Sequence, residues 1–266
     1  MIIFFKNIFS RFPYFYSLLS FLYHFKNKYW QPRRFNNLFK LLEIYASTKE
    51  GVYFIQVGAN DGLSNDPLNN FIQKFGWVGI CIEPIPMNFN KLSQTYKNNA
   101  GINLLNAAIG DKPQKKIYYI NPEKAEKLSI ILPEWYSQLA SFDKDLVISD
   151  MNGERKSEIV EEMEITCISF EKIICDYKIK KVELLHIDTE GADWMILSSF
   201  PFHLSHPDII IFEHSHLNLI DYKNAIQLLK GYRYKLLKVD TDTFCYSENF
   251  YSEYKNARKK SHLIVK

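Results

Sequence analysis

Cysteine is scarce in this sequence, and the four cysteines form no recognisable group. Cys81, Cys167, Cys175 and Cys245 are scattered along the chain, and none has the C-x-x-C or similar spacing of a metal site. Three of them fall within apolar runs typical of strands or helices. This pattern argues against a disulfide framework and indicates reduced, buried thiols in a cytoplasmic protein.

Acidic residues are absent before Glu43, whereas seven lysines and arginines occur there. The rest of the chain therefore holds 26 basic against 30 acidic residues, and the formal net charge of the whole chain is only +3. So small a charge argues against nucleic-acid binding. A basic N-terminal arm precedes a mildly acidic body.

Long hydrophobic runs are also lacking, even in the apolar segment 2–25. Its longest uncharged stretch, Phe12 to about Tyr23, is too short to span a bilayer, and no small-residue cleavage site follows it. Apolar side chains recur there at helical spacing, so residues 1–50 are predicted to form a helical extension. Its aromatic and basic residues 1–34 suit either peripheral contact with the inner membrane surface or packing on the chain's own domain. No pattern specifies an oligomeric state.

Strand and helix patterns alternate after Gly51, with no repeat and no linker rich in Pro, Gly or Ser. Continuous apolar runs predict strands buried on both faces, and amphipathic segments between them predict helices. The alternation predicts one α/β domain over residues 51–266, with a doubly wound, mostly parallel sheet. Predicted strands are 52–57, 77–83, 102–109, 115–120, 161–168, 182–188 and 207–213, with a closing hairpin of 234–240 and 242–248. Predicted helices begin after Pro32 and near 67, 87, 169, 192 and 221.

Polar or glycine-rich segments follow five of these strands, and they read GANDG, EPIP, NAAIGD, DTEGAD and EHSHL. Ligands of such sheets bind at the carboxyl ends of the strands, so these segments are expected to converge on one site. A region departs from the alternation at about 111–180, where 132–148 is predicted to be irregular. This insert is expected to cover the substrate, and Trp135 and Tyr136 could stack on a sugar or simply pack.

The segment GANDG has the features of a nucleoside-binding turn. Gly58 and Gly62 allow a sharp turn and close approach of a ligand, and Glu83 ends the next strand where an acid can grip a ribose diol. A pyrophosphate would be repelled by Asp61, whereas S-adenosylmethionine carries a sulfonium, an ammonium and no phosphate. The charges therefore favour S-adenosylmethionine, although a glycine turn can also serve packing alone.

The motifs VGANDG with SNDP, IEPIP, NAAIGD, LLHIDTEGADWMIL and PDIIIFEH, in this order, resemble the FkbM-type S-adenosylmethionine-dependent methyltransferases. The resemblance covers about residues 52–216. It implies a Rossmann-like methyltransferase fold with an antiparallel last strand. It also implies O-methylation, commonly of sugar hydroxyls in polysaccharides, glycolipids or secondary metabolites.

The same resemblance implies residue roles. Gly58, Asn60 and Gly62 fall on the cofactor loop, Glu83 on the ribose acid, and Asn106, Ala107 and Ala108 near the adenine. This sequence departs from the pattern at Gln56, where methyltransferases often have an acid. The methionine moiety is then expected to contact Gln56, the backbone or Asp188.

A sugar hydroxyl is a poor nucleophile, so a base or a metal ion is expected to activate it. His214 is the preferred base because its ordinary pKa lies near neutral pH, and Asp188 and Glu213 are alternatives. Structural roles are also open, since Asp188 could cap a helix and Glu190 could bond its own turn. A divalent cation could be held by Asp188, Glu190, Glu213, His214 and His216, with both histidines on one face of an extended strand.

These interpretations leave two other classes of protein open. One is an NAD(P)-dependent Rossmann oxidoreductase, and the other is a non-catalytic cofactor-binding scaffold. The density of acids and histidines at the strand ends argues against the scaffold. The expected partner is a small-molecule or glycan substrate.

Overall fold

The computed structural model describes residues 36–49, 51–133, 136–151 and 155–252. The predicted extension 1–50 lies largely outside this part, as does the segment 1–34 considered for membrane contact. Helix α3 (Asn36–Thr48) confirms the helix expected between Pro32 and Gly51. Among the described residues, no helix combines the length and apolar character needed to cross a membrane.

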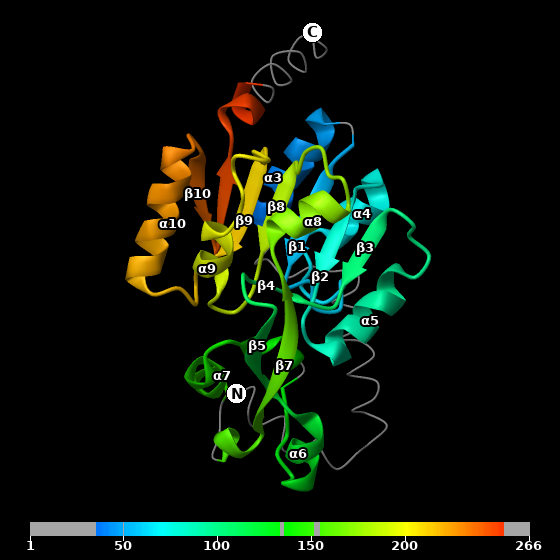
Figure 1. Ribbon diagram of the computed structural model, residues 1–266, viewed down its shortest axis with the longest axis vertical. Coiled ribbons are helices and arrows are strands. Elements are labelled where there is room, and N and C mark those ends of the chain that lie inside the picture. Colours follow the sequence, from blue (N-terminus) through cyan, green and yellow to red (C-terminus); the bar gives the residue numbers. More distant parts are fainter. Residues whose placement is uncertain (1–35, 50, 134–135, 152–154, 253–266) are drawn as a thin grey trace.

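A seven-stranded sheet forms the centre of the molecule, with five parallel strands and a hairpin at one edge (Figure 1). The strand order is β10-β11-β9-β8-β1-β2-β3, and β11 runs antiparallel to β9 and β10. This topology confirms the predicted mostly parallel sheet with an antiparallel last strand. The strands are β1 (Tyr53–Val57), β2 (Val78–Ile82), β3 (Ile102–Leu105), β8 (Leu184–Ile187), β9 (Ile209–Glu213), β10 (Lys235–Val239) and β11 (Asp242–Tyr246).

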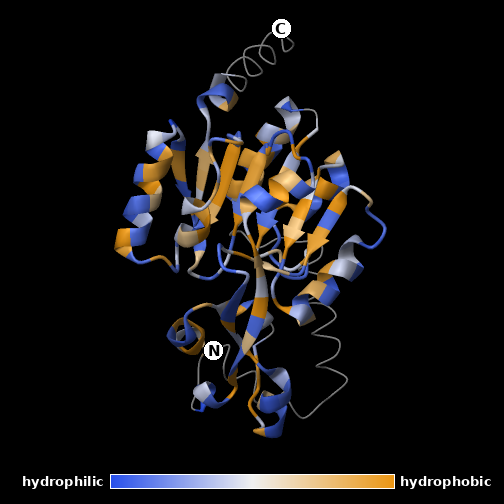
Figure 2. Ribbon diagram, viewed as in Figure 1, coloured by the Kyte–Doolittle hydropathy of each residue, from blue (hydrophilic) through white to orange (hydrophobic). Residues whose placement is uncertain are grey.

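Helices cover both faces of this sheet, because successive residues of a strand point to opposite sides. Phe54 of β1 belongs to one core with buried residues of α3, α4 and α5, whereas its neighbour Ile55 belongs to a second core with α8, α9 and α10. The central strands are almost uniformly hydrophobic for this reason (Figure 2). The covering helices are α4 (Asn69–Phe75), α5 (Pro86–Tyr96), α8 (Phe170–Asp176), α9 (Asp193–Ser198) and α10 (Leu219–Gly231).

The strand predicted over 102–109 is in fact two strands in two sheets. β3 pairs with β2 and ends at Leu105, whereas β4 (Ala108–Ile109) pairs with β7 of a separate sheet. At the break, Asn106 Nδ2 donates hydrogen bonds to the carbonyls of Glu83 (2.8 Å) and Pro84 (3.1 Å). These contacts turn the chain out of the main sheet, so the prediction of one continuous strand is wrong.

A four-stranded sheet of order β4-β7-β5-β6 forms the core of the insert and projects from the carboxyl end of the main sheet (Figure 1). The predicted strands are confirmed as β5 and β7, which pair antiparallel. The segment 132–148 was predicted to be irregular, but its described residues include a 3-10 turn, β6 and α7; Trp135 lies outside them. The elements are β5 (Gln114–Ile120), α6 (Pro122–Lys127), Tyr136–Gln138, β6 (Ala140–Ser141), α7 (Lys144–Asp150), Lys156–Glu158 and β7 (Val160–Ile168).

Candidate active site

A cavity of about 850 Å³, counting its part open to solvent, lies where the carboxyl ends of β1, β2 and β8 meet the insert. This is the edge at which open α/β sheets bind ligands. The sheet contributes Gln56, Gly58, Asn60, Glu83 and Asp188 to the lining, and the insert contributes Ile117, Gln138, Ala140, Ser141 and Phe142.

The two glycines of the first turn serve different purposes. Gly58 has a φ of 79°, and a Cβ there would lie 1.8 Å from the backbone oxygen of Asp188, so β1 and β8 can approach only with glycine at this position. Gly62, with a φ of 68°, instead packs against Tyr96 and Leu92 of α5. Only Gly58 of the pair is among the described residues that line the cavity.

Glu83 joins the turn after β1 to the end of β2. Its Oε2 accepts a hydrogen bond from the Asn60 backbone N–H (2.9 Å), and its Oε1 accepts one from the Ile85 N–H (2.8 Å). Only 5% of its surface is exposed, and burial raises the pKa of its carboxyl to about 7. The carboxylate still has lone pairs for further donors, which fits the predicted role toward a diol.

Asp66 supplies the acid that is missing at Gln56. Gln56 Nε2 donates to Asp66 Oδ1 (3.1 Å), which also accepts from the Leu68 N–H (2.7 Å). Burial raises the pKa of the Asp66 carboxyl to about 6. In the sequence, Asp66 is the acid of the SNDP segment after the loop, and the absence of an acid at position 56 is the signal that could have identified it.

Four residues that line the cavity each have a buried polar atom with no hydrogen-bond partner among the described residues: Asn60 Oδ1, Asp66 Oδ2, Asn88 Oδ1 and His186 Nδ1. Burial without a partner costs about 1–3 kcal/mol for each such group, so native structures contain few of them. Their concentration around one cavity indicates a site completed by a polar ligand with several donors and acceptors.

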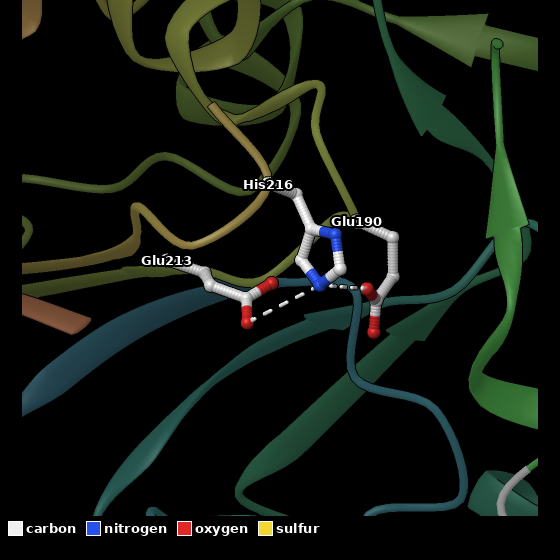
Figure 3. A group of neighbouring side chains, drawn as sticks. All are labelled: Glu190, Glu213 and His216. Carbon is white, nitrogen blue, oxygen red and sulfur yellow. Dashed lines mark ion pairs between the residues drawn. The ribbon is translucent and has the colours of Figure 1, made fainter. Parts of the chain in front are cut away.

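A group of acids lies beside the cavity, at the ends of β8 and β9. His216 Nε2 lies 3.1 Å from Glu190 Oε2 and 3.8 Å from Glu213 Oε1, so the ring stands between the two carboxylates (Figure 3). Ser215 Oγ donates to Glu213 Oε1 (2.7 Å). Of this group, Glu190 also lines the cavity.

Asp188 lines the same wall of the cavity, and its pKa is raised well above the ordinary value by burial and by the neighbouring acids Glu213, Glu190, Asp193 and Asp242. Asp193 is fully buried and accepts hydrogen bonds from Thr189 Oγ1 (3.0 Å) and the Glu213 N–H (3.1 Å), while burial raises its pKa to about 8. The residue before α9 is Ala192, which makes no side-chain cap, so the structural role considered for Asp188 as a helix cap is not observed.

His214 lies apart from this group. Its Nδ1 is 3.2 Å from Thr243 Oγ1, its ring is 5.2 Å from that of Tyr222, and burial lowers its pKa. It is not among the described residues that line the cavity. The expectation that His214 and His216 share one face of an extended strand is wrong, because β9 ends at Glu213 and the chain turns there.

Three residues assigned to the cofactor also lie away from the cavity lining. Asp61 accepts hydrogen bonds from the Leu63 and Ser64 N–H groups (2.9 and 2.7 Å) and so holds its own turn together. Asn106 binds the carbonyls of Glu83 and Pro84, and neither it nor Ala107 lines the cavity, whereas Ala108 of the same segment does, together with Ile109. The acids that face the cavity are thus Asp66, Glu83, Asp188 and Glu190.

This sheet topology, with glycine turn, strand-end acid and ligand cavity at one edge, is that of a Rossmann-like methyltransferase. The model of the family described as "Methyltransferase FkbM domain" matches residues 56–236. The chain therefore belongs to the FkbM methyltransferase family, and it is a methyltransferase of the class that uses S-adenosylmethionine.

Several solved structures are similar at low sequence identity. Methyltransferase FkbM from Methylobacillus flagellatus KT is 14% identical with a TM-score of 0.43, covering 74% of this chain and 44% of that chain. Ribosomal protein L11 methylase from Lactobacillus delbrueckii subsp. bulgaricus is 10% identical (TM-score 0.38), covering 78% of this chain and 74% of that one. Curated protein sequences gave no match.

Proposed function

We propose that this chain transfers a methyl group from S-adenosylmethionine to a hydroxyl group of a sugar, on a surface glycan, a glycolipid or a secondary metabolite. Family membership supports the methyl transfer. The observation that supports the assignment to this cavity is that four of its lining residues have a buried polar atom without a hydrogen-bond partner among the described residues, beside a glycine turn and a strand-end acid.

The residues present fit the cofactor. The Glu83 carboxylate would accept hydrogen bonds from the ribose diol, and Asp66, held by Gln56, would bind the ammonium of the methionine moiety. Neither lysine nor arginine occurs among the described residues that line the cavity. A pyrophosphate would therefore meet carboxylates without a cation to bind it, which argues against the dinucleotide oxidoreductase.

When bound, S-adenosylmethionine supplies a methyl carbon whose bond to sulfur breaks, with the electron pair staying on sulfur, as the acceptor oxygen bonds to it. The protein has to align the acceptor hydroxyl and accept its proton. Asp188 is the residue proposed to accept this proton, since it lines the cavity next to Gly58 and close to Glu190.

The insert is proposed to form the acceptor side of the site. Its residues Gln138, Ser141 and Phe142 line the cavity opposite the sheet, and Ser141 Oγ donates a hydrogen bond to the backbone oxygen of Glu190 (2.9 Å). The acceptor would thus enter between the insert and the acids at the strand ends.

The proposal is tested by incubating the protein with methyl-labelled cofactor and a glycolipid and polysaccharide extract, and locating the label by mass spectrometry. Label on a sugar oxygen is expected.

Asp188→Asn should lower the transfer rate by about 10²–10⁴-fold while S-adenosylhomocysteine still binds, and His214→Gln should stay active. An inactive His214→Gln with an active Asp188→Asn would move the base to His214, whereas label on nitrogen or carboxylate alone would refute sugar O-methylation. Cofactor binding without transfer to any acceptor would support the scaffold alternative.

A further inference from the structure

We propose that Glu190, Glu213 and His216 bind one first-row divalent cation at the acceptor end of the cavity. The site stands on its own geometry, and its part in catalysis rests on the proposed function. Glu190 comes from the turn after β8, Glu213 is the last residue of β9, and His216 follows in the next turn (Figure 3). Two neighbouring strand ends thus supply the three donors.

The spacing of the donor atoms suits a single ion. One atom from each residue can be chosen so that all lie within 4.8 Å of one another, and the imidazole nitrogen is 3.1 and 3.8 Å from the two carboxylates. Ligands held about 2.0–2.2 Å from one ion lie within about 4.4 Å of each other, so only a small side-chain rotation is needed. Two carboxylates and one imidazole suit Mn²⁺ or Zn²⁺ better than a soft metal.

Neighbouring hydroxyl groups contact one of the three donors directly and the backbone of a second. The Ser215 hydroxyl binds Glu213 Oε1 at 2.7 Å, and the Ser141 hydroxyl binds the Glu190 backbone oxygen at 2.9 Å. Such outer contacts are typical of metal sites, where they fix the direction of the ligands.

The cavity wall next to this group provides an independent sign of a ligand. His186 is 2% exposed, and its Nδ1 has no hydrogen-bond partner among the described residues. His186 lies in β8 and Asp188 directly follows this strand, and both line the cavity together with Glu190. A polar molecule in the cavity would therefore reach the ion from this side, and its hydroxyl oxygen could become a ligand with a lowered pKa.

The experiment uses the full chain, stripped with EDTA and titrated with MnCl₂, with free Mn²⁺ followed by electron paramagnetic resonance. Saturable binding of one Mn²⁺ is expected for the wild type. His216→Ala and Glu190→Gln should weaken this binding at least about tenfold. His203→Ala removes an exposed histidine elsewhere and should bind Mn²⁺ like the wild type. Thermal melting of each variant shows that it is folded.

An alternative arrangement is a protonated His216 held between two glutamates, which predicts no saturable Mn²⁺ binding. That result, or equal binding by His216→Ala and the wild type, would overturn the metal site. Titration with S-adenosylhomocysteine separates this outcome from failure of the proposed function. Binding of S-adenosylhomocysteine without binding of Mn²⁺ would contradict the metal site alone. Binding of Mn²⁺ without binding of S-adenosylhomocysteine would contradict the cofactor assignment and would still support the metal site.

Discussion

At the scale of single residues, Asp66 is the proposed acceptor for the ammonium group of the cofactor. Position 56, where an acid was expected from the family resemblance, is a glutamine. The amide of Gln56 holds the Asp66 carboxylate by one oxygen, and the second oxygen is buried at the cavity. A carboxylate therefore stands in the segment after β1, held by the amide at position 56.

Asp66→Asn should therefore weaken binding of S-adenosylhomocysteine, which keeps the ammonium. A hydrogen bond to a charged group contributes about 1.5–3 kcal/mol, so the dissociation constant should rise about 10–100-fold in calorimetry. Asp61→Asn is the matched control, because Asp61 holds its own turn and does not line the cavity. Equal losses in the two variants would contradict the role of Asp66.

Glu83 leads to a pH prediction. Its pKa rises from an ordinary 4.5 to about 7 on folding, so between these values the folded state binds more protons than the unfolded state. This carboxyl therefore favours the folded state at low pH, and its contribution to the unfolding free energy falls as the pH rises from 4.5 to about 7, by about 1.4 kcal/mol per pH unit. Without cofactor, the stability of Glu83→Gln should lack this decline. Parallel pH dependences in urea denaturation of the two proteins would contradict it.

Three residues that the sequence assigns to the cofactor stand at or just after strand ends. Gly58, Asn60 and Glu83 line the cavity because parallel strands bring their carboxyl ends to one edge. His214 was preferred as the base because its ordinary pKa lies near neutral pH, and His214 and His216 were expected to share one face of an extended strand. The pairing of β9 with β11 ends at Glu213, opposite Asp242. The turn that follows β9 brings His216 close to the Glu213 carboxylate. Long-range pairing of this kind leaves no local pattern.

At the scale of elements, the chain after β1 lies so close to the chain after β8 that only glycine fits at position 58. The Asp188 N–H donates to the Val57 oxygen (3.0 Å), and the next residue, Gly58, touches the Asp188 backbone. The turn that carries the cofactor loop therefore depends on this contact.

Gly58→Ala should destabilise the protein by more than the cost of a positive φ alone. Gly76→Ala is the control, because Gly76 also has a positive φ (64°) but a Cβ there meets nothing within 4 Å. The control should lose about 1–2 kcal/mol of unfolding free energy, and Gly58→Ala should lose at least about twice that. Similar losses in chemical denaturation would mean that β1 and β8 separate readily.

The alternation of strands and helices could be predicted because each element carries its own apolar pattern. The break between β3 and β4 could not, since it depends on hydrogen bonds from Asn106 to residues 22 and 23 positions earlier. Helix α7 was missed although a local signal exists: the Asp143 carboxylate accepts from the Asp145 and Leu146 N–H groups as a helix cap.

At the scale of the whole molecule, the insert and the main sheet enclose the cavity together. The Ser141–Glu190 hydrogen bond joins the insert to the turn that carries one proposed metal ligand. The acceptor side of the site therefore depends on how firmly the two parts are held.

Ser141→Ala should loosen this connection. Amide hydrogen exchange should become faster in residues 140–143 and 188–192, and the unfolding free energy should fall by about 0.5–1.5 kcal/mol. Ser149→Ala is the control, since the Ser149 hydroxyl bonds only the Leu146 oxygen of its own helix. Unchanged exchange in the turn after β8 would show that the insert is held by other contacts.

The proposed use of S-adenosylmethionine depends above all on a cavity whose described lining residues include several acids and no lysine or arginine that could bind a phosphate. Calorimetric titration of the full chain with S-adenosylhomocysteine and, separately, with NADH tests this most directly. Saturable heat with the first and none with the second is predicted. Binding of NADH without binding of S-adenosylhomocysteine would contradict the account.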